Sequence, residues 1–334
     1  MKQQLYWIVM IPIVFLLFGM NLLTGSVSIP FREVLTILTG GEATRPTWNY
    51  IVMETRLPQA LTAMLCGGAL ATSGLLLQTA FRNPLAGPGI FGITNGAALG
   101  VALVMLGFGG GASLELLPVE GFMAVVVSAF IGAMAVMGLL LLFSTMVKNH
   151  VMLLIVGMMT GYLSSAVISM LNYMATEEGV RSYMMWGMGS FSGVSMKQIP
   201  YFIGLVIVGL SCALLLVKPL NAWVLGNTYA RNLGVNTRRL SQMLLMVTGL
   251  LCAVTTAFCG PVAFIGLAVP HIARLLLVTE NHRVLMPATV LMGAAVALLC
   301  NWLCYLPADG NAIPLNTVTP LVGVPVIVYV ILRK

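Results

Sequence analysis

Long apolar stretches limit what this chain can fold into more than any other feature of its sequence. Ten of them follow one another, each close to the roughly 20 residues that a helix needs to cross a bilayer. They lie at about 5–23, 58–79, 90–107, 118–143, 151–173, 200–217, 241–259, 262–278, 285–304 and 314–332. Lipid offers the backbone no hydrogen-bond partner, so each stretch is predicted to be a helix. The expected fold is all-α, a polytopic membrane protein with about ten transmembrane helices.

The charge content points to the same solvent. Only 7% of the residues are charged, against about 25% in a typical soluble domain. Too few polar side chains remain to cover a water-facing surface, so the lipid bilayer is the expected surrounding. Ten spans leave no room for a separate soluble domain, and residues 1–334 are predicted to form one transmembrane domain. The stretch 262–278 contains Pro270, His271 and Arg274, so a short or re-entrant helix is an alternative there.

Two further readings concern the N-terminus and the cysteines. Lys2 and the apolar run after it resemble a signal peptide, but the run is long for one and the rest of the chain is equally apolar. A retained first helix is therefore expected.

Six cysteines lie mostly inside apolar segments without a CxxC pair, so they are expected to be packing residues rather than disulfides or metal ligands.

Basic residues predict the orientation in the membrane. If the N-terminus is inside and the spans alternate, eleven of the 16 basic residues fall on the inner side and five on the outer side. An excess of Lys and Arg marks the cytoplasmic face, so both termini are predicted to be cytoplasmic. Residues 24–57 then form an outer loop and residues 218–240 a cytoplasmic loop. The basic residues are scattered over loops, which argues against binding of nucleic acid.

Several motifs of energy conversion are missing. No aspartate or glutamate lies in the interior of a predicted span, which argues against a proton-driven transporter. A sodium ion held by backbone carbonyls stays possible, so an ion-coupled secondary transporter for a small molecule remains the alternative. The phosphate-binding pattern GxxxxGK[ST] and hydrolase motifs are also absent from the sequence. The chain is therefore not expected to be an enzyme, and any ATP must bind to another chain.

Short motifs separate the apolar stretches. They are ETRLPQ at 54–59, RNPLAGPG at 82–89, GITNGA at 92–97, RSYMMWGMGSF at 181–191, LGNTYARNLGV at 225–235, GPVAFIGLAVPHIARLL at 260–276, HRVLMP at 282–287 and VGVP at 322–325. The prolines and glycines of 82–89 require a shaped turn. The segment 225–235 is a helix-compatible stretch between glycines, either a solvated loop or a docking helix for a soluble partner. His271 is expected to be a structural histidine.

In this order, the motifs resemble the FecCD family, the permeases of ATP-binding-cassette importers for ferric siderophores, haem and vitamin B12. The resemblance covers nearly the whole chain and includes the run from Gly67 to Gly74 and Gln78. It implies a ten-helix subunit in the cell (inner) membrane that pairs as a homodimer around a central path. It also implies two ATPase subunits, which bind ATP and Mg²⁺, on the cytoplasmic face, and an external binding protein that delivers the substrate. Import by alternating access is the implied mechanism, with an iron chelate as the commoner cargo.

The resemblance also assigns roles to residues. ATPase contact is implied for Gly226, Ala230, Arg231, Leu233 and Gly234, followed by Arg238 and Arg239. Docking of the binding protein is implied for Arg56, with Arg45 as a further candidate. Positions near the cytoplasmic gate are Asn83, Leu85, Asn149, His150 and Val151. Thr160 and Ser164 are candidates to line the path, and Arg181 matches an arginine that faces the outer vestibule.

The sequence also departs from the family pattern at the predicted outer side. Gln59 replaces the second arginine of the RLPR motif, and Tyr305 stands near the position of another arginine. Ala312, Pro314 and Asn316 occupy an E-x-P-x-G motif that has lost its glutamate and glycine. The usual charge pairs with a binding protein are therefore incomplete, and Arg45, Arg56 and Arg181 are the remaining candidates.

Overall fold

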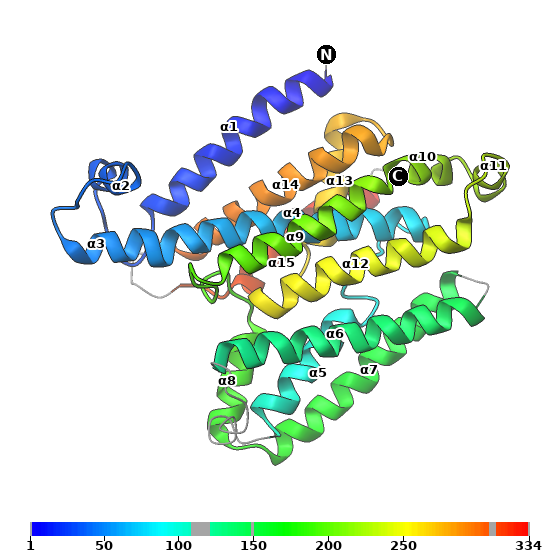
Figure 1. Cartoon of the computed structure of the whole chain (residues 1–334), viewed down its shortest axis with the longest axis horizontal. Helices are drawn as coiled ribbons and strands as arrows, with labels where there is room; N and C mark the ends of the chain where they lie inside the picture. The colour runs from blue at the N-terminus through cyan, green and yellow to red at the C-terminus, as the bar shows by residue number, and fades with distance from the viewer. Residues whose placement is uncertain (1, 108–120, 148–149, 307–311, 333–334) are drawn as a thin grey trace.

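The computed structural model describes residues 2–107, 121–147, 150–306 and 312–332, and every element in these ranges is a helix (Figure 1). Each of the ten predicted stretches coincides with one long helix. These helices are α1 (Lys2–Leu23), α4 (Leu57–Phe81), α5 (Ile93–Met105), α6 (Gly121–Met146), α7 (His150–Met174), α9 (Ile199–Leu215), α12 (Thr237–Cys259), α13 (Ile265–Leu277), α14 (His282–Cys304) and α15 (Leu315–Leu332). Shorter elements are α2 (Phe31–Leu38), α3 (Pro46–Tyr50), the π-helical turn η1 (Ile51–Arg56), α8 (Glu177–Gly187), α10 (Val217–Val224) and α11 (Asn227–Asn232).

Not every long helix is long enough to cross a bilayer. Among the described residues, six helices have the length and hydropathy of a complete span, or seven if the bent pair α9 and α10 counts as one. The apolar helices α5 and α13 have 13 residues each. At 1.5 Å per residue they reach about 20 Å, less than the roughly 30 Å of the hydrocarbon core. The predicted boundaries 90–107 and 262–278 were therefore too long, and a count of ten crossings stays a prediction.

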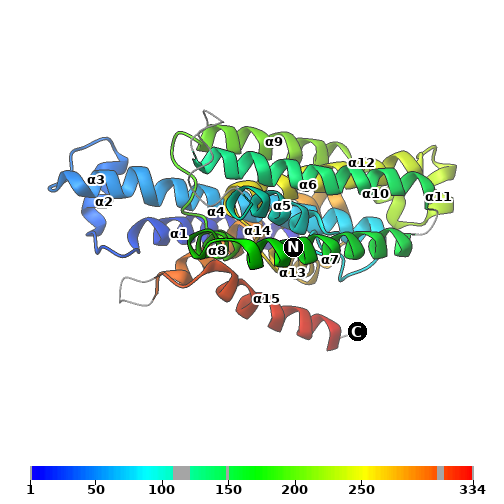
Figure 2. The same cartoon turned by 90° about the horizontal axis from the view of Figure 1, so that it is seen from below.

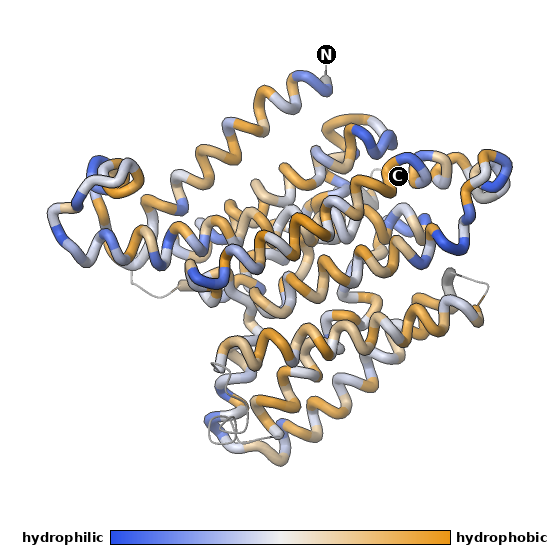
Figure 3. Tube along the Cα trace, in the orientation of Figure 1, coloured by the Kyte–Doolittle hydropathy of each residue, from blue (hydrophilic) through white to orange (hydrophobic). Residues whose placement is uncertain are grey.

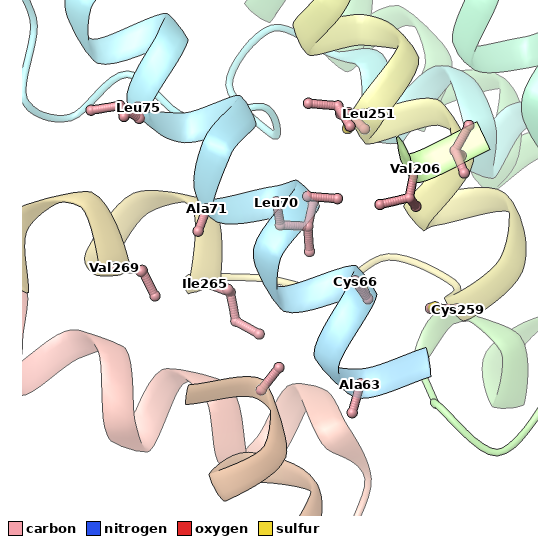
Figure 4. Packing of buried hydrophobic residues seen from close by; sticks show 14 of the residues in the cluster. Ala63, Cys66, Leu70, Ala71, Leu75, Val206, Leu251, Cys259, Ile265 and Val269 are labelled. Atoms are coloured by element: carbon pink, nitrogen blue, oxygen red, sulfur yellow. The ribbon is translucent and has the colours of Figure 1, made fainter. Parts of the chain in front are cut away.

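Helix α4 forms the centre of the molecule. It packs against α14, α12, α13 and α9, and most of its side chains are buried (Figure 2). Figure 4 shows the small residues that allow this, among them Ala63, Cys66 and Ala71 on α4, close to side chains of α12 and α13. A Cβ atom built on Gly67 would lie 2.1 Å from the carbonyl oxygen of Gly293 in α14, and one on Gly74 would lie 1.6 Å from that of Gly266 in α13. Backbone therefore packs directly on backbone, as small residues permit in membrane helices.

The helices form two groups. One consists of α5, α6, α7 and α8, and the other surrounds α4 (Figure 1). Helix α12 lies between them and contacts both α4 and α6. Within the first group, α5 and α6 approach closely because glycines face each other, with Gly96 and Gly100 on α5 opposite Gly132 on α6. The glycine spacing in GITNGA and beyond therefore serves the packing of α5 on α6.

The second half of the predicted outer loop 24–57 is helical instead. Residues Pro46–Phe81 form one continuous rod of 36 residues that runs through α3, η1 and α4. Proline cannot donate its backbone nitrogen, and its ring clashes with the carbonyl four residues earlier in a regular α-helix. The π-helical turn Ile51–Arg56 lies immediately before Pro58 and widens the helix where that clash would fall. Sequence rules place Pro58 at a helix start, so they missed this continuation.

Polar residues gather at two opposite ends of the molecule, with an apolar belt between them (Figure 3). One end carries α10, α11 and the connection from α13 to α14, and it is called the α11 end here. The other end carries α2, α3 and α8 and is called the α2 end. Both chain termini lie toward the α11 end (Figure 1). Which side of the membrane each end faces remains a prediction, based on the count of basic residues.

Helix α1 is hydrogen-bonded to α14 along its length. The Tyr6 hydroxyl donates to the carbonyl oxygen of Ala288 at 2.7 Å, near the α11 end. Toward the α2 end, the Asn21 amide donates to the Leu298 carbonyl at 3.0 Å and accepts from the Asn301 amide at 2.7 Å. These buried polar pairs fix α1 on the surface of α14.

Candidate coupling surface and translocation path

Helix α11 is the short helix that the sequence predicted between glycines. Gly226 precedes it at φ 127° and Gly234 follows it at φ 81°, both in the region that favours glycine. Nothing lies within 4 Å of a Cβ atom at either position, so backbone conformation rather than space demands these glycines. The Gly234 amide closes the C-terminal turn by donating to the Arg231 carbonyl at 2.9 Å. The two glycines thus let a one-and-a-half-turn helix project at the α11 end.

Most residues assigned to ATPase contact are exposed there. Arg231, Leu233, Gly234, Arg238 and Arg239 are exposed, and Gly226 is partly exposed. Ala230 is different, because it is fully buried and therefore supports α11 from within rather than offering surface. Sequence reasoning did not single out Leu225 and Tyr229, which are 66% and 50% exposed. The end of the molecule therefore presents apolar and basic side chains together.

The turn at 82–89 lies beside this surface. Arg82 adopts a left-handed conformation (φ 47°) and donates to the Trp223 carbonyl in α10 at 3.0 Å. The Asn83 carboxamide oxygen accepts from the Leu85 amide at 2.9 Å, which shapes the turn, and Leu85 is 42% exposed. His271 of α13 bonds to the Pro84 carbonyl at 2.6 Å, so it is a structural histidine, as predicted.

The other predicted gate residues belong to the start of α7. Asn149 lies outside the described residues, and His150 and Val151 form the first turn of α7 by their backbone. The role of all three at the gate stays a prediction.

A buried polar cluster joins α4 to α13 near the same end. The Gln78 amide donates to the Leu267 carbonyl at 3.0 Å, and its oxygen accepts from Arg274 at 2.6 Å. Arg274 also forms an ion pair with the exposed Glu280 at 3.2 Å. Sequence reasoning named Gln78 as a family position, and its partners explain why an amide that donates and accepts is needed there.

Helix α7 leaves a long apolar face uncovered. Its exposed large side chains are Met152, Ile155, Met159, Tyr162, Leu163, Val167, Met170, Tyr173 and Met174. The opposite face packs on α5, where a Cβ atom on Gly157 would lie 2.9 Å from the Cα atom of Phe91. Ser164 is buried on that packed side, so in this conformation it does not line an open path. Its hydroxyl donates to the Thr160 carbonyl at 3.0 Å, and the Thr160 hydroxyl donates to the Val156 carbonyl at 2.8 Å.

A hollow of about 540 Å³ opens where α7 meets α8 at the α2 end. Arg181 is exposed at its wall, as a vestibule residue would be. Asn172 also lines this region, and its buried carboxamide oxygen has no hydrogen-bond partner among the described residues. The remaining wall consists of Ala175, Glu177, Val180, Met184, Met185 and Met188. Methionine side chains adapt to ligands of different shapes. The hollow is therefore better suited to contact a large ligand of variable shape than to form one tight polar binding site.

The sequence profile of the FecCD transport family matches residues 13–333. The chain belongs to the FecCD transport family. The vitamin B12 import system permease protein BtuC of Klebsiella pneumoniae subsp. pneumoniae is 35% identical over 326 residues, which covers 95% of this chain and 93% of that protein. BtuC of Salmonella typhi is 34% identical over 322 residues, covering 94% of this chain and 95% of that protein.

Solved structures agree with this assignment. A metal-chelate type ABC transporter in an inward-facing conformation is 30% identical, with a TM-score of 0.83 over 97% of this chain and 98% of that one. PsaBC from Streptococcus pneumoniae, at 14% identity and a TM-score of 0.58, covers 82% of this chain and 90% of that one and shares the fold. This FecCD chain is an inner-membrane protein, and several of its described helices are long and apolar enough to span a bilayer.

Within the FecCD chain, Arg56 has a structural environment. It is 5% exposed, and its guanidinium donates to the carbonyls of Leu22 at 2.8 Å, Leu23 at 2.9 Å and also Val27. It therefore holds the end of α1 and the chain that follows it. Arg45 is exposed, with its guanidinium 5.2 Å from the ring centre of Trp48. Of the two predicted docking arginines, Arg45 offers its charge to a partner in this conformation and Arg56 does not.

Three residues that depart from the FecCD pattern form hydrogen bonds with one another or with the backbone of neighbouring elements. They are Gln59, Tyr305 and Asn316. The Gln59 amide donates to the Tyr305 hydroxyl at 2.9 Å and to the Asn301 carboxamide oxygen at 3.0 Å. A neutral link between α4 and α14 thus stands where the family pattern places arginines. Asn316 donates to the carbonyls of Pro261 at 2.7 Å and Gly187 at 3.2 Å, and it accepts from the Ala263 amide at 3.1 Å. The residue in the place of the motif glycine therefore ties α8 and α15 to the chain before α13.

Proposed function

We propose that this chain is the membrane-spanning permease subunit of an ATP-binding-cassette importer for a bulky metal chelate. Two copies form a homodimer, and the substrate moves inward along the dimer axis by alternating access. Two ATPase subunits bind at the α11 end, which faces the cytoplasm, and they hold the ATP and Mg²⁺. An external binding protein delivers the chelate at the α2 end.

The observation that carries this proposal is α11 itself. It is a helix too short to be stable alone, yet its position is fixed by two glycines of positive φ and by packed neighbours. Its outward residues combine apolar Leu225, Tyr229 and Leu233 with Arg231. Such a mixed surface, projecting from an otherwise membrane-embedded protein, fits a soluble partner that delivers force from outside the bilayer.

Alternating access is supported by the two helix groups. Arg238 donates to the Thr145 carbonyl at the end of α6 at 2.8 Å, whereas α10 packs on α14 and α4. The segment around α11 is therefore attached to both groups. A push on it would turn α5 to α8 relative to the helices around α4, and α7 would move with its group. The few charges along α7 suit a conduit that binds a bulky ligand weakly, since a single tight site would hinder release.

The cargo is proposed as a class. Cobalamin, a ferric siderophore and haem are all bulky metal chelates, and cobalamin is the first to test because the BtuC relatives are named for vitamin B12 import. Binding measurements on the external protein that partners this chain would choose among the three chelates.

Reconstitution tests the function directly. Proteoliposomes that hold this chain with its co-purified ATPase and external binding protein are expected to accumulate the chelate only with ATP. Proteoliposomes that hold this chain alone, with a proton or sodium gradient, are expected to accumulate none. Gradient-driven uptake by the chain alone would instead support a secondary transporter.

A further inference from the structure

Helix α10 connects α9 to α11, and it is held in place by more than apolar packing. It turns away from α9 by 48°. Its side chains Leu220 and Trp223 are buried against the neighbouring helices. Asn221, between them, points its carboxamide at the start of α14 and makes three hydrogen bonds there.

The first two bonds fix the orientation of that carboxamide. Its oxygen accepts from the backbone amide of His282 at 2.8 Å, and its NH₂ group donates to the side-chain oxygen of Asn281 at 2.9 Å. Asn281 in turn caps α14 by accepting from the Arg283 amide at 3.0 Å. The N-terminal amides of a helix need such partners, so Asn221 takes part in capping the N-terminus of α14.

The third bond reaches the core through a histidine. The His282 ring is fully buried, its Nδ1 lies 3.0 Å from the Asn221 oxygen, and its Nε2 lies 3.0 Å from the Thr79 hydroxyl of α4. The Asn221 oxygen is already an acceptor, so the neutral ring carries its proton on Nδ1, and its Nε2 is an acceptor for the Thr79 hydroxyl. That hydroxyl shares its single proton between His282 Nε2 and the Leu75 carbonyl of its own helix, at 2.9 Å. A continuous chain of hydrogen bonds therefore runs from α10 through α14 to α4.

Arg82 adds a second attachment between the same elements. Its guanidinium donates to the Trp223 carbonyl, two residues along α10 from Asn221. Arg82 is the first residue after α4, so both attachments join α10 to the same end of that helix. Between α10 and α11 only Leu225 and Gly226 intervene, which leaves little chain to absorb a movement of α11.

We infer that Asn221 and His282 are positioning residues of the transport cycle, which pass a displacement of α11 to α4 and α14. The inference rests on the proposed function, because it presumes that a partner moves α11. The inner part of this network, His282 and Thr79, is buried and has a definite geometry, since leaving either side chain unpaired in the interior is costly. A displaced α10 therefore carries the ends of α4 and α14 with it. Without the network, α10 keeps its apolar contacts but can slide over α14.

The test measures ATP hydrolysis and uptake in the same proteoliposomes of the complete transporter. Asn221→Leu and His282→Ala are expected to lower uptake per ATP hydrolysed by about fivefold or more, the lower end of the usual range for coupling between sites. Asn221→Asp keeps the accepting oxygen and is expected to retain most of the coupling. In the double variant the two losses are expected not to add, because both remove one chain of bonds.

Thr79→Val and Thr72→Val form a matched pair. Both threonines are buried in α4. Among the described residues, the Thr72 hydroxyl bonds only to the Gly68 carbonyl of its own helix, whereas the Thr79 hydroxyl bonds to the Leu75 carbonyl of its helix and also reaches His282. Uptake per ATP is expected to fall with Thr79→Val and to stay unchanged with Thr72→Val. These nearly isosteric changes keep the fold, and size-exclusion chromatography checks the assembled complex.

Each outcome is decisive. If the unmodified transporter imports with ATP and the three variants Asn221→Leu, His282→Ala and Thr79→Val all keep its uptake per ATP, the inference is overturned and the proposed function stands. If Thr72→Val lowers the ratio as much as Thr79→Val, general packing explains the effect and the inference is also overturned. If the unmodified transporter shows no ATP-driven uptake, the proposed function fails and the inference falls with it.

Discussion

Gly74 marks the closest contact between α4 and its neighbours. A Cβ atom there would meet the Gly266 carbonyl at 1.6 Å, and backbone cannot move aside as a flexible side chain can. Gly74→Ala is therefore expected to destabilise the protein by about 3 kcal/mol, the upper range of overpacking. Gly138→Ala, in α6 with nothing within 4 Å, is the matched control and is expected to change stability by less than about 1 kcal/mol. Thermal unfolding in detergent measures both, and equal stability of the two variants would contradict the packing.

Arg56 allows a second prediction about a single side chain. Arg56→Ala leaves the carbonyls of Leu22, Leu23 and Val27 without their donor, so a loss of about 2–4 kcal/mol is expected. Arg56→Lys is expected to recover little, because a compact ammonium cannot reach three carbonyls as a planar guanidinium does. Arg45→Ala is expected to leave stability unchanged and to weaken binding of the external protein. Wild-type stability of Arg56→Ala in the same detergent assay would show that the guanidinium does not hold α1.

Sequence reasoning reached some residues better than others. It identified His271 as structural and Gln78 as a family position, because their motifs carry them. It passed over Asn221, whose partner His282 lies 61 residues away, and it met His282 only as the first residue of the HRVLMP motif, without a role. It assigned Arg56 to docking because the residue matches the first arginine of the family's RLPR motif, whereas the folded chain buries that guanidinium. Which polar groups pair across a fold depends on how the helices pack, and a single sequence does not state that.

At the level of elements, α2 and α3 are joined through one carboxylate. Glu33 accepts from the Thr44 hydroxyl at 2.5 Å and from the Thr44 amide at 2.9 Å. These hydrogen bonds lower the pKa of the Glu33 carboxyl, because they stabilise its charged form. The stabilisation that the ionised Glu33 carboxylate gives to the folded state is therefore complete above the ordinary glutamate pKa, about 4.3. It is lost as the pH falls through the lowered pKa.

Exchange of the backbone amide of Thr44 with deuterium reports this joint. We expect protection at neutral pH and a gain in exchange, corrected for the intrinsic effect of pH, as the carboxyl is protonated. Glu33→Gln should exchange faster at neutral pH and show little further change on acidification. Protection that is the same in both proteins at every pH would exclude the role of Glu33.

Helix α11 gives a prediction about coupling. Gly234→Ala forces a side chain into left-handed backbone at a cost of roughly 1–2 kcal/mol, which tilts or frays the turn after α11 without disturbing the membrane helices. Combined with Arg231→Ala, which removes an exposed charge, it is expected to lower ATP-driven uptake while the permease stays folded and inserted. Uptake in proteoliposomes and recovery of ATPase on affinity purification measure the effect. Unaltered transport in the double variant would remove α11 from the partner contact.

Elements differ in how well sequence patterns predicted them. Composition and backbone chemistry are enough to recognise the glycines around α11 and the apolar runs of α4, α12 and α14 in the sequence. The start of α13 does not, because Phe264 adopts a positive φ of 65° that only the surrounding packing can impose on a phenylalanine. The continuous rod through Pro58 was missed for a similar reason. Its π-helical turn resolves a clash that sequence rules read as a helix boundary.

At the level of the whole molecule, the two groups of helices explain how a chain without a nucleotide-binding motif could be driven. Helix α12 contacts both groups, and Arg238 at its start reaches the last residues of α6. Asn221 and Arg82 hold α10 to the other group. A force applied between these attachments is shared by both groups, so their relative rotation is the natural response. Hydropathy predicted the helices but not this division, which follows from glycine contacts such as Gly96 with Gly132.

The exposed face of α7 leads to a prediction about assembly. If two copies pair along this helix, single cysteines at Tyr162, Leu163, Met170 and Tyr173 are expected to form disulfides between copies on mild oxidation, with yields that follow the helical period. A cysteine at Phe15 on α1, 73% exposed on a different helix, is the control and should stay monomeric. The native chain sets the background, because five of its six cysteines are buried.

Equal yields at Phe15 and along α7 would mean that random collisions in the membrane cause the cross-links. If every position stayed monomeric in the assembled transporter, the dimer axis could not lie beside α7, and the path proposed between the two copies would have to be placed along another helix.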